Sequence, residues 1–189
     1  KLFFKEKYNR FYFDWDFKKQ RVNILENSAV NSIYFGYWQD IKYFESIKYI
    51  LMKELKLKNV ISDKVKQISK NVVNPNSVAV HIRGGDIEFD NNFKHVDDKY
   101  YINAIKFFKN KLGKVQLNVM TDDIGLAKKQ ISKIIKDYSN IFFINELQLS
   151  DLEEFYLFGQ HKNLIASRST FSWWSSYLCE DKNNKECAR

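Results

Sequence analysis

The sequence is poor in residues that break or cross-link a chain, with one proline, six glycines and two cysteines among 189 residues. Together with a hydrophobic fraction of 44%, this argues against disorder and favours a globular, helix-rich chain that can bury a core. Cys179 and Cys187 match no metal-ligand spacing. Without a secretory signal, we expect both to be reduced in the cytosol.

Long apolar segments and clustered histidines are missing as well. No run of about 18 apolar residues occurs, so the sequence predicts no membrane-spanning helix. The opening segment 1–5, Lys-Leu-Phe-Phe-Lys, is too short and too soon charged to be a secretory signal. His81, His95 and His161 are isolated from one another, so we predict no metal site built by the protein.

Positive charge is in excess, with 31 basic against 23 acidic side chains and a net charge of +8. The excess can attract an anionic partner such as a nucleotide, a phospholipid surface or a nucleic acid. It can also reflect lysines spread over solvated helix faces, which fits the helical spacing of most of them. The aromatic residues mostly follow core spacing, which argues against a nucleic-acid binder.

Apolar runs alternate with amphipathic segments from residue 76 onward, and this alternation predicts a domain over 76–189. The expected strands are 77–83, 115–120, 140–144 and 163–166, and the expected helices are 97–112, 124–138, 150–159 and 170–178. Four strands alternating with four helices predict an α/β fold, a Rossmann-like parallel sheet with helices on both faces.

Residues 1–75 are expected to form a separate N-terminal helical and irregular segment. Its aromatic first 40 residues indicate an edge hairpin or a surface that packs on a missing partner. Helices are expected over 41–57 and 63–69, followed by a turn at 74–76.

Ligands bind parallel sheets outside the carboxyl ends of the strands, often against helix N-termini. Polar residues stand at four such ends, and these loops are 83–86, 121–123, 145–148 and 167–170.

Arg83 ends the first strand of this predicted domain. Strand alternation places it on one face with Ala79 and His81. The glycines that follow allow a close backbone approach to a ligand. A guanidinium suits a diphosphate because it donates two parallel, charge-assisted hydrogen bonds. An ordinary surface pair with Asp86 at a turn explains the same spacing equally well.

Hydroxyl residues and carboxylates occupy two of the other strand ends. Ser167, Ser169 and Thr170 precede a helix, where free backbone N–H groups and the helix dipole favour an anion. Ordinary capping accounts for part of this pattern. Asp122 could accept hydrogen bonds from a guanine edge or a ribose hydroxyl. For Asp123 we favour capping of the next helix.

Taken together, these segments resemble the inverting α-1,2-fucosyltransferases, glycosyltransferase family 11 of GT-B type, which use GDP-fucose. Residues 81–86, His-Ile-Arg-Gly-Gly-Asp, resemble the family motif His-x-Arg-Arg-Gly-Asp, and residues 169–174 keep its Ser-Thr-Phe-Ser-Trp-Trp core. Residues 120–123 match its Ser-Asp-Asp region, and 36–39 match its Gly-Tyr-Trp-Gln stretch. The resemblance runs from about residue 36 to 178.

The sequence departs from the family pattern in three places. Gly84 replaces the second arginine of the first motif, and Arg168 stands where the family has asparagine and could supply the missing cation. The family's opening Gly-Gly-Leu-Gly-Asn-Gln segment does not occur. That segment belongs to the other half of a GT-B fold, so we expect a truncated or unusually short chain that holds the donor-binding half.

The resemblance implies transfer of L-fucose from GDP-fucose to a glycan hydroxyl, without a cofactor or metal, and with Arg83 as the catalytic residue. It assigns donor binding to His81, Arg83, Asp86, Asp122, Ser169, Thr170 and Phe171. The general base stays open among Asp90, Asp97 and Asp98.

The acceptor would be a glycan or lipid-linked oligosaccharide of a bacterial surface polysaccharide. The setting would be cytoplasmic, with peripheral association at the inner face of the membrane. Transfer in another linkage, or a donor domain that binds GDP without turnover, are the alternatives.

Overall fold

The structure is a computed structural model that describes residues 10–13, 32–36, 40–55, 61–84, 96–135, 139–178 and 186–188. The chain divides into two compact units, Lys1–Lys48 and Tyr49–Arg189. The division falls before the boundary predicted at residue 75. Helix α3 (Asp63–Val72) belongs with the sheet domain, because its Val65 is fully buried and the helix packs on α6 (Asp151–Gln160).

The first unit contains the strands β1 (Arg10–Phe13) and β2 (Ser32–Phe35), which pair in parallel with Arg10 opposite Ser32. A hairpin joins antiparallel strands, so this pair is not the edge hairpin that was one of the two expectations for the first 40 residues. The helix predicted over 41–57 is interrupted. Two 3-10 turns, η1 (Ile41–Tyr43) and η2 (Glu45–Ile47), precede α2 (Lys48–Glu54), because the backbone leaves the helical region at Phe44.

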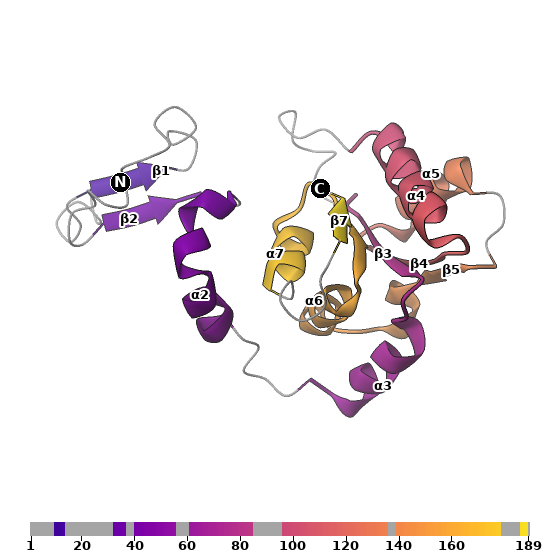
Figure 1. Ribbon diagram of the computed structural model, residues 1–189, viewed down its shortest axis with the longest axis horizontal. Coiled ribbons are helices and arrows are strands. Elements are labelled where there is room, and N and C mark those ends of the chain that lie inside the picture. The colour runs from indigo at the N-terminus through magenta and orange to yellow at the C-terminus, as the bar shows by residue number, and fades with distance from the viewer. Residues whose placement is uncertain are drawn as a thin grey trace. The chain divides into compact units, whose positions relative to one another are not determined.

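The second unit is an α/β layer built on a five-stranded parallel sheet in the order β5-β4-β3-β6-β7. Its strands are β3 (Ser77–Ile82), β4 (Gln116–Thr121), β5 (Ile141–Phe143), β6 (Asn163–Ile165) and β7 (Glu186–Ala188). The remaining elements are α4 (Asp98–Leu112), α5 (Ile124–Ile134), the 3-10 turn η4 (Ile144–Leu147) and α7 (Thr170–Leu178). The four predicted strands are confirmed, and β7 adds a fifth (Figure 1).

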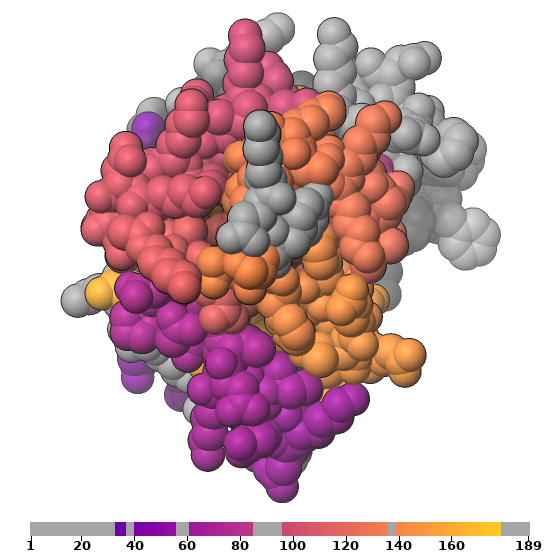
Figure 2. All heavy atoms as spheres, turned by 90° about the vertical axis from the view of Figure 1, so that its right-hand side faces the viewer, coloured from indigo at the N-terminus to yellow at the C-terminus, as the bar shows by residue number. Residues whose placement is uncertain are grey.

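Helices cover both faces of this sheet, as predicted. Val78, Val80 and Ile82 of β3 point to one face and join a core cluster with residues of α4 and α5. Ala79 points to the opposite face, in a second cluster with residues of α6 and, at its margin, α3. In Figure 2, α4 and α5 form the upper part of the unit and α3 lies at its base. The strand thus contributes to two cores by simple alternation.

Helix boundaries follow the predicted capping residues closely. Asp97 caps α4 by accepting from the N–H of Lys99 at 3.0 Å, and Gly113 ends that helix with a φ of 75°, which favours glycine. Ser150 and Glu153 form a complete capping box at the start of α6. Helix α5 ends at Ile134, earlier than predicted, because the backbone of Ile135 is extended.

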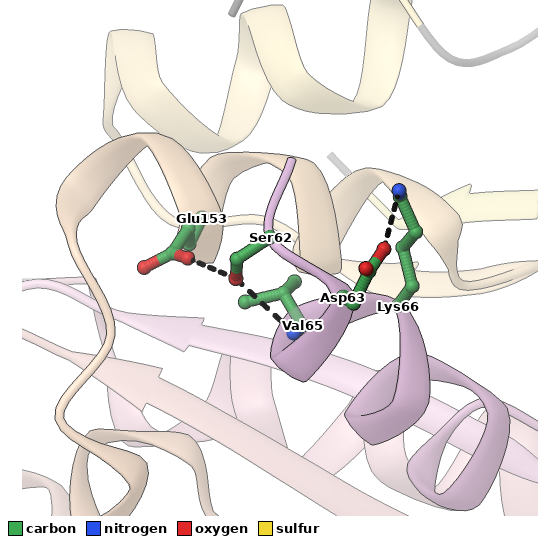
Figure 3. Close-up of polar contacts among 5 residues, drawn as sticks. All are labelled: Ser62, Asp63, Val65, Lys66 and Glu153. Carbon is green, nitrogen blue, oxygen red and sulfur yellow. Dashed lines mark hydrogen bonds and ion pairs between the residues drawn. The ribbon is translucent and has the colours of Figure 1, made fainter. Parts of the chain in front are cut away.

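Ser62 joins α3 to α6 by acting as acceptor and donor at once (Figure 3). Its hydroxyl accepts from the N–H of Val65 at 3.3 Å and so caps α3. The same hydroxyl donates to Glu153 at 2.6 Å. This bond, with those from Ser150, holds the pKa of Glu153 below its ordinary value. One serine therefore caps one helix while fixing it to the capping box of another.

Candidate functional site

The strand order of the sheet reverses at β3, with β4 and β5 on one side of it and β6 and β7 on the other. Loops that leave neighbouring strands in opposite directions open a crevice at such a point, and ligands of parallel sheets bind there. In this chain the reversal lies between β3 and β6, so the same rule predicts a ligand site between the loops that follow these two strands. These are two of the four loops that the sequence singled out.

Arg83 lies directly after β3 and is half-buried. Its Nη1 donates to the hydroxyl of Ser169, in the loop after β6, at 3.4 Å. The structure thus brings together the two residues that the sequence predicted for a phosphate grip. A guanidinium and a hydroxyl at the start of a helix are groups that can bind a diphosphate together.

Ser169 organises the loop before α7. Its hydroxyl accepts from the N–H of Phe171 at 3.2 Å, and its carbonyl accepts from the N–H of Trp173 at 3.1 Å. The predicted capping function is therefore present beside the contact with Arg83. The N–H of Phe171, predicted for a phosphate, donates to Ser169 in this structure. Thr170 is the first residue of α7, at the positive end of the helix dipole.

His81 lies beneath this loop and supports it. Its ring is 7% exposed, and its Nδ1 lies 2.7 Å from the hydroxyl of Ser167. The ring also packs against Phe171, with centroids 5.3 Å apart, and against Phe158 at 6.1 Å. Burial lowers the pKa of His81 to about 4, with Arg83 adding to the shift and Asp122 opposing it. The imidazole is therefore neutral near pH 7 and holds the loop in place.

The loop after β4 contacts the end of β3 on the other side. The backbone N–H of Gly84 donates to Asp122 Oδ1 at 2.7 Å. Asp123 caps α5 by accepting from the N–H of Leu126 at 2.9 Å, which confirms the predicted capping role. Asn145, after β5, accepts from the N–H of Thr121 at 3.2 Å. Hydrogen bonds thus link all four predicted loops along one edge of the sheet.

Several predicted residues fall elsewhere. Asp86 and Asp90 lie outside the described residues. Asp97 caps α4, and the carboxylate of Asp98 accepts from Lys133 Nζ at 2.6 Å. Both of these carboxylates therefore have structural partners, and neither gains support as the general base.

Two tyrosines that sequence reasoning missed anchor α4 to the site. The Tyr100 hydroxyl donates to the carbonyl of Ala166 at 2.6 Å, and the Tyr101 hydroxyl donates to the carbonyl of His81 at 3.1 Å. Burial raises the pKa of the Tyr101 hydroxyl above its ordinary range. These bonds tie the first turn of α4 to the ends of β6 and β3. Only the adjacency of two tyrosines near a helix start signals this in the sequence.

Glu154, in the first turn of α6, is a further residue that the sequence did not single out. Burial, and then the nearby Asp151, raise its pKa to about 7. Within the part of the chain that the structure describes, no group of three or more His, Cys, Asp or Glu side chains could hold a metal ion. No helix among the same residues is both long and apolar enough to cross a membrane.

Comparison with solved structures identifies the fold. A structure of POFUT1 in complex with GDP matches with a TM-score of 0.54 at 12% identity, covering 84% of this chain and 54% of that one. A POFUT1 structure in complex with GDP-fucose matches with a TM-score of 0.52 at 12% identity, covering 92% and 56%. At this identity the likeness shows the fold alone, which is of the GT-B type.

Curated relatives are more similar in sequence. An alpha-1,2-colitosyltransferase of Escherichia coli is 31% identical over 160 residues, which are 82% of this chain and 54% of the relative. A galactoside 2-alpha-L-fucosyltransferase of Caenorhabditis elegans is 27% identical, over 78% of this chain and 42% of the relative. WbnK, an O-antigen biosynthesis glycosyltransferase of Escherichia coli, is also 27% identical, over 78% and 51%.

The chain therefore spans about half the length of the curated relatives it matches. The family profile of glycosyl transferase family 11 matches it over residues 1–185, nearly the whole sequence. This chain belongs to glycosyl transferase family 11.

Proposed function

We propose that this chain supplies the donor-binding part of an inverting glycosyltransferase that moves L-fucose from GDP-fucose to a glycan hydroxyl, in α-1,2 linkage. The observation that carries the proposal is the contact between Arg83 and Ser169 across the point where the strand order reverses. Family membership and the names of the relatives, which include a fucosyltransferase and a colitosyltransferase, support the reaction class and a related donor sugar.

Arg83 is the proposed catalytic residue. When the bond to fucose breaks, negative charge grows on the β-phosphate of the leaving GDP. A preorganised guanidinium stabilises this charge without a metal ion. Ser169 and Thr170, at the start of α7, would hold the phosphates with the help of the helix dipole. Displacement from the face opposite GDP would then invert the anomeric carbon.

The remaining predicted residues would bind or support the donor. Asp122 is exposed at the same edge of the sheet, and its carboxylate can accept hydrogen bonds from a guanine or ribose. His81 would act from below by holding Ser167 and Phe171. Asp86 is proposed to help shape the site.

The acceptor is proposed to be a glycan or a lipid-linked oligosaccharide in bacterial surface-polysaccharide synthesis, modified on the cytoplasmic side of the membrane. A basic surface on α4 and α5 supports contact with an anionic bilayer. Residues 99–121 contain five lysines and no acidic side chain, and Lys106, Lys111 and Lys114 are exposed there. Lys129 is exposed on α5, which packs on the same face of the sheet as α4.

Calorimetry with GDP, GDP-fucose and UDP, each with and without a chelator, tests the donor assignment. We expect guanine-selective binding that the chelator does not change. Equal affinity for UDP would overturn the donor assignment, and binding lost with the chelator would overturn the metal-independent mechanism.

Two alternative functions share the proposed donor site and differ from the proposed function only in whether fucose is transferred or in the linkage that is formed. A chain that binds GDP but transfers no fucose to any acceptor would be a donor domain without activity. Transfer that yields a different linkage, identified by NMR of the product, would place the chain among GDP-fucose-dependent enzymes of another specificity.

A further inference from the structure

We propose that Gly84 is a positioning residue, whose missing side chain lets the end of β3 lie against the turn between β4 and α5 and so fixes Asp122 beside Arg83. The inference rests on the proposed function, because it concerns the geometry of the same donor site. It goes beyond that function by assigning a role to a residue that bonds to Asp122 through its backbone N–H.

The contact is close enough to exclude any side chain at position 84. A Cβ built on Gly84 would lie 2.6 Å from Asp123 Cβ and 2.9 Å from Leu126 Cδ2, both closer than real Cβ contacts. The Leu126 methyl belongs to the end of a flexible side chain and can move away. The Cβ of Asp123 cannot move by itself, because it is bonded directly to the backbone.

Hydrogen bonds also hold both the side chain and the backbone of Asp123 in place. Its carboxylate caps α5 by accepting from the N–H of Leu126 at 2.9 Å. Its backbone N–H donates to the hydroxyl of Thr121 at 3.0 Å, and its carbonyl accepts from that hydroxyl at 3.0 Å. A side chain at position 84 would therefore force the end of β3 away from the turn.

That displacement would reach the two charged groups of the site. The N–H of Gly84 donates to Asp122 Oδ1 at 2.7 Å, a short bond to a charged acceptor. Arg83 is the adjacent residue in the chain. One backbone contact thus ties the residue that follows Arg83 directly to the carboxylate proposed to bind the nucleoside.

The test compares GDP affinity and thermal stability in the wild type and in variants that carry the full chain. For Gly84→Ala we expect GDP binding to weaken on the order of 10-fold or more, the effect of losing a hydrogen bond to a charged group. Asp123→Gly removes the Cβ that the new methyl group would meet, and glycine is a tolerated helix N-cap. The double variant, Gly84→Ala with Asp123→Gly, should therefore recover most of the lost affinity.

Gly125→Ala is the matched control. A Cβ at Gly125 meets Asp123 Oδ1 at 3.3 Å, a tight contact that a small shift of that side chain relieves, and the residue is exposed, so its GDP affinity should stay near that of the wild type. A purely structural role for Gly84 would lower the melting temperature without a selective loss of affinity. If the wild type binds GDP and Gly84→Ala binds it equally well, or Asp123→Gly gives no recovery, the inference is overturned alone. A wild type that binds no GDP overturns the proposed function and this inference together.

Discussion

The Nδ1 atom of His81 lies 2.7 Å from the hydroxyl of Ser167 and joins the ends of β3 and β6, the two strands between which the proposed donor site opens. Burial lowers the pKa of His81 to about 4 from an ordinary 6.5. The loop before α7 is therefore supported by a histidine that the fold keeps neutral, and protonation of that histidine opposes folding.

The stability of the chain should depend on pH through His81. Because the pKa is lower in the folded state, the unfolded chain binds the proton first as the pH falls. Stability is fully present above pH 6.5 and declines as the pH falls toward 4. The shift from 6.5 to about 4 corresponds to about 3 kcal/mol at its full extent. Urea unfolding between pH 8 and pH 4 measures this dependence.

The matched variant is His81→Gln, which keeps a polar side chain but does not titrate. We expect it to be less stable than the wild type at pH 8 and to lose much less stability on acidification. A variant with the same acid dependence as the wild type would contradict the assignment of that dependence to His81.

A buried hydrogen-bond network around Asn118 of β4 supplies the second prediction. Asn118 is fully buried, and its amide nitrogen lies 2.8 Å from the carbonyl of Val72 and 2.7 Å from His161 Nε2. His161 Nδ1 lies 2.9 Å from the carbonyl of Leu157, so Nδ1 donates there and Nε2 accepts from Asn118. Asn118→Asp replaces both donors by an oxygen. We expect the free energy of unfolding, measured with urea at pH 8, to fall by at least about 3 kcal/mol.

Gln116→Ala is the comparison for this network. Its amide donates to Asn118 Oδ1 at 2.9 Å, but Gln116 is only half-buried, so water can replace the bond. We expect Gln116→Ala to lower the free energy of unfolding by about 1 kcal/mol. If Asn118→Asp and Gln116→Ala lower the free energy of unfolding by the same amount, the buried hydrogen bonds of Asn118 matter no more than the half-buried one of Gln116.

Local sequence signals predicted most of the sheet domain correctly. The apolar alternation of Val78, Val80 and Ile82 sets which face each residue meets, and that information is contained within six residues of chain. The caps at Asp97 and Ser150 are equally local, since each side chain bonds to a backbone N–H two or three residues away.

Features that depend on distant parts of the chain were not predicted. Strand β7, Glu186–Ala188, has no apolar alternation that would predict it. It is a strand in the structure because it pairs with the edge of β6. The parallel pairing of Arg10 with Ser32 likewise has no local signal. At position 84 the sequence showed only a glycine where an arginine was expected. The structure adds that Asp123, far along the chain, closes this position to side chains.

Glu154 supplies a prediction of opposite sign to that of His81. Burial, and then Asp151, raise its pKa from 4.5 to about 7. An acid whose pKa is raised by folding favours the fold at low pH, and this contribution is lost as the pH rises through 7. Glu154→Gln should therefore stabilise the chain at pH 8, by about 1 kcal/mol after allowance for screening by solvent. The same variant at pH 5 should show a smaller gain, and an equal gain at both values would contradict the titration of Glu154.

Arg83→Ala tests the catalytic proposal directly. Removing one preorganised donor to a developing charge costs on the order of 10²- to 10³-fold in rate. Transfer from GDP-fucose should fall by that factor, while the melting temperature stays near that of the wild type because Arg83 is only half-buried. Arg83→Lys keeps a positive charge but not the planar fork, so we expect an intermediate rate.

Arg168→Ala decides whether a second cation takes part. Arg168 is exposed in the loop after β6, one residue before Ser169, whose hydroxyl accepts from Arg83. Salt screens an exposed charge, so a change of less than about 10-fold is expected if Arg83 alone grips the donor. A loss as large as that of Arg83→Ala would instead assign the grip to both arginines. In that case Arg168 would compensate for Gly84, and the double variant Arg83→Ala with Arg168→Ala should be little worse than either single one, as expected for residues that act as a unit.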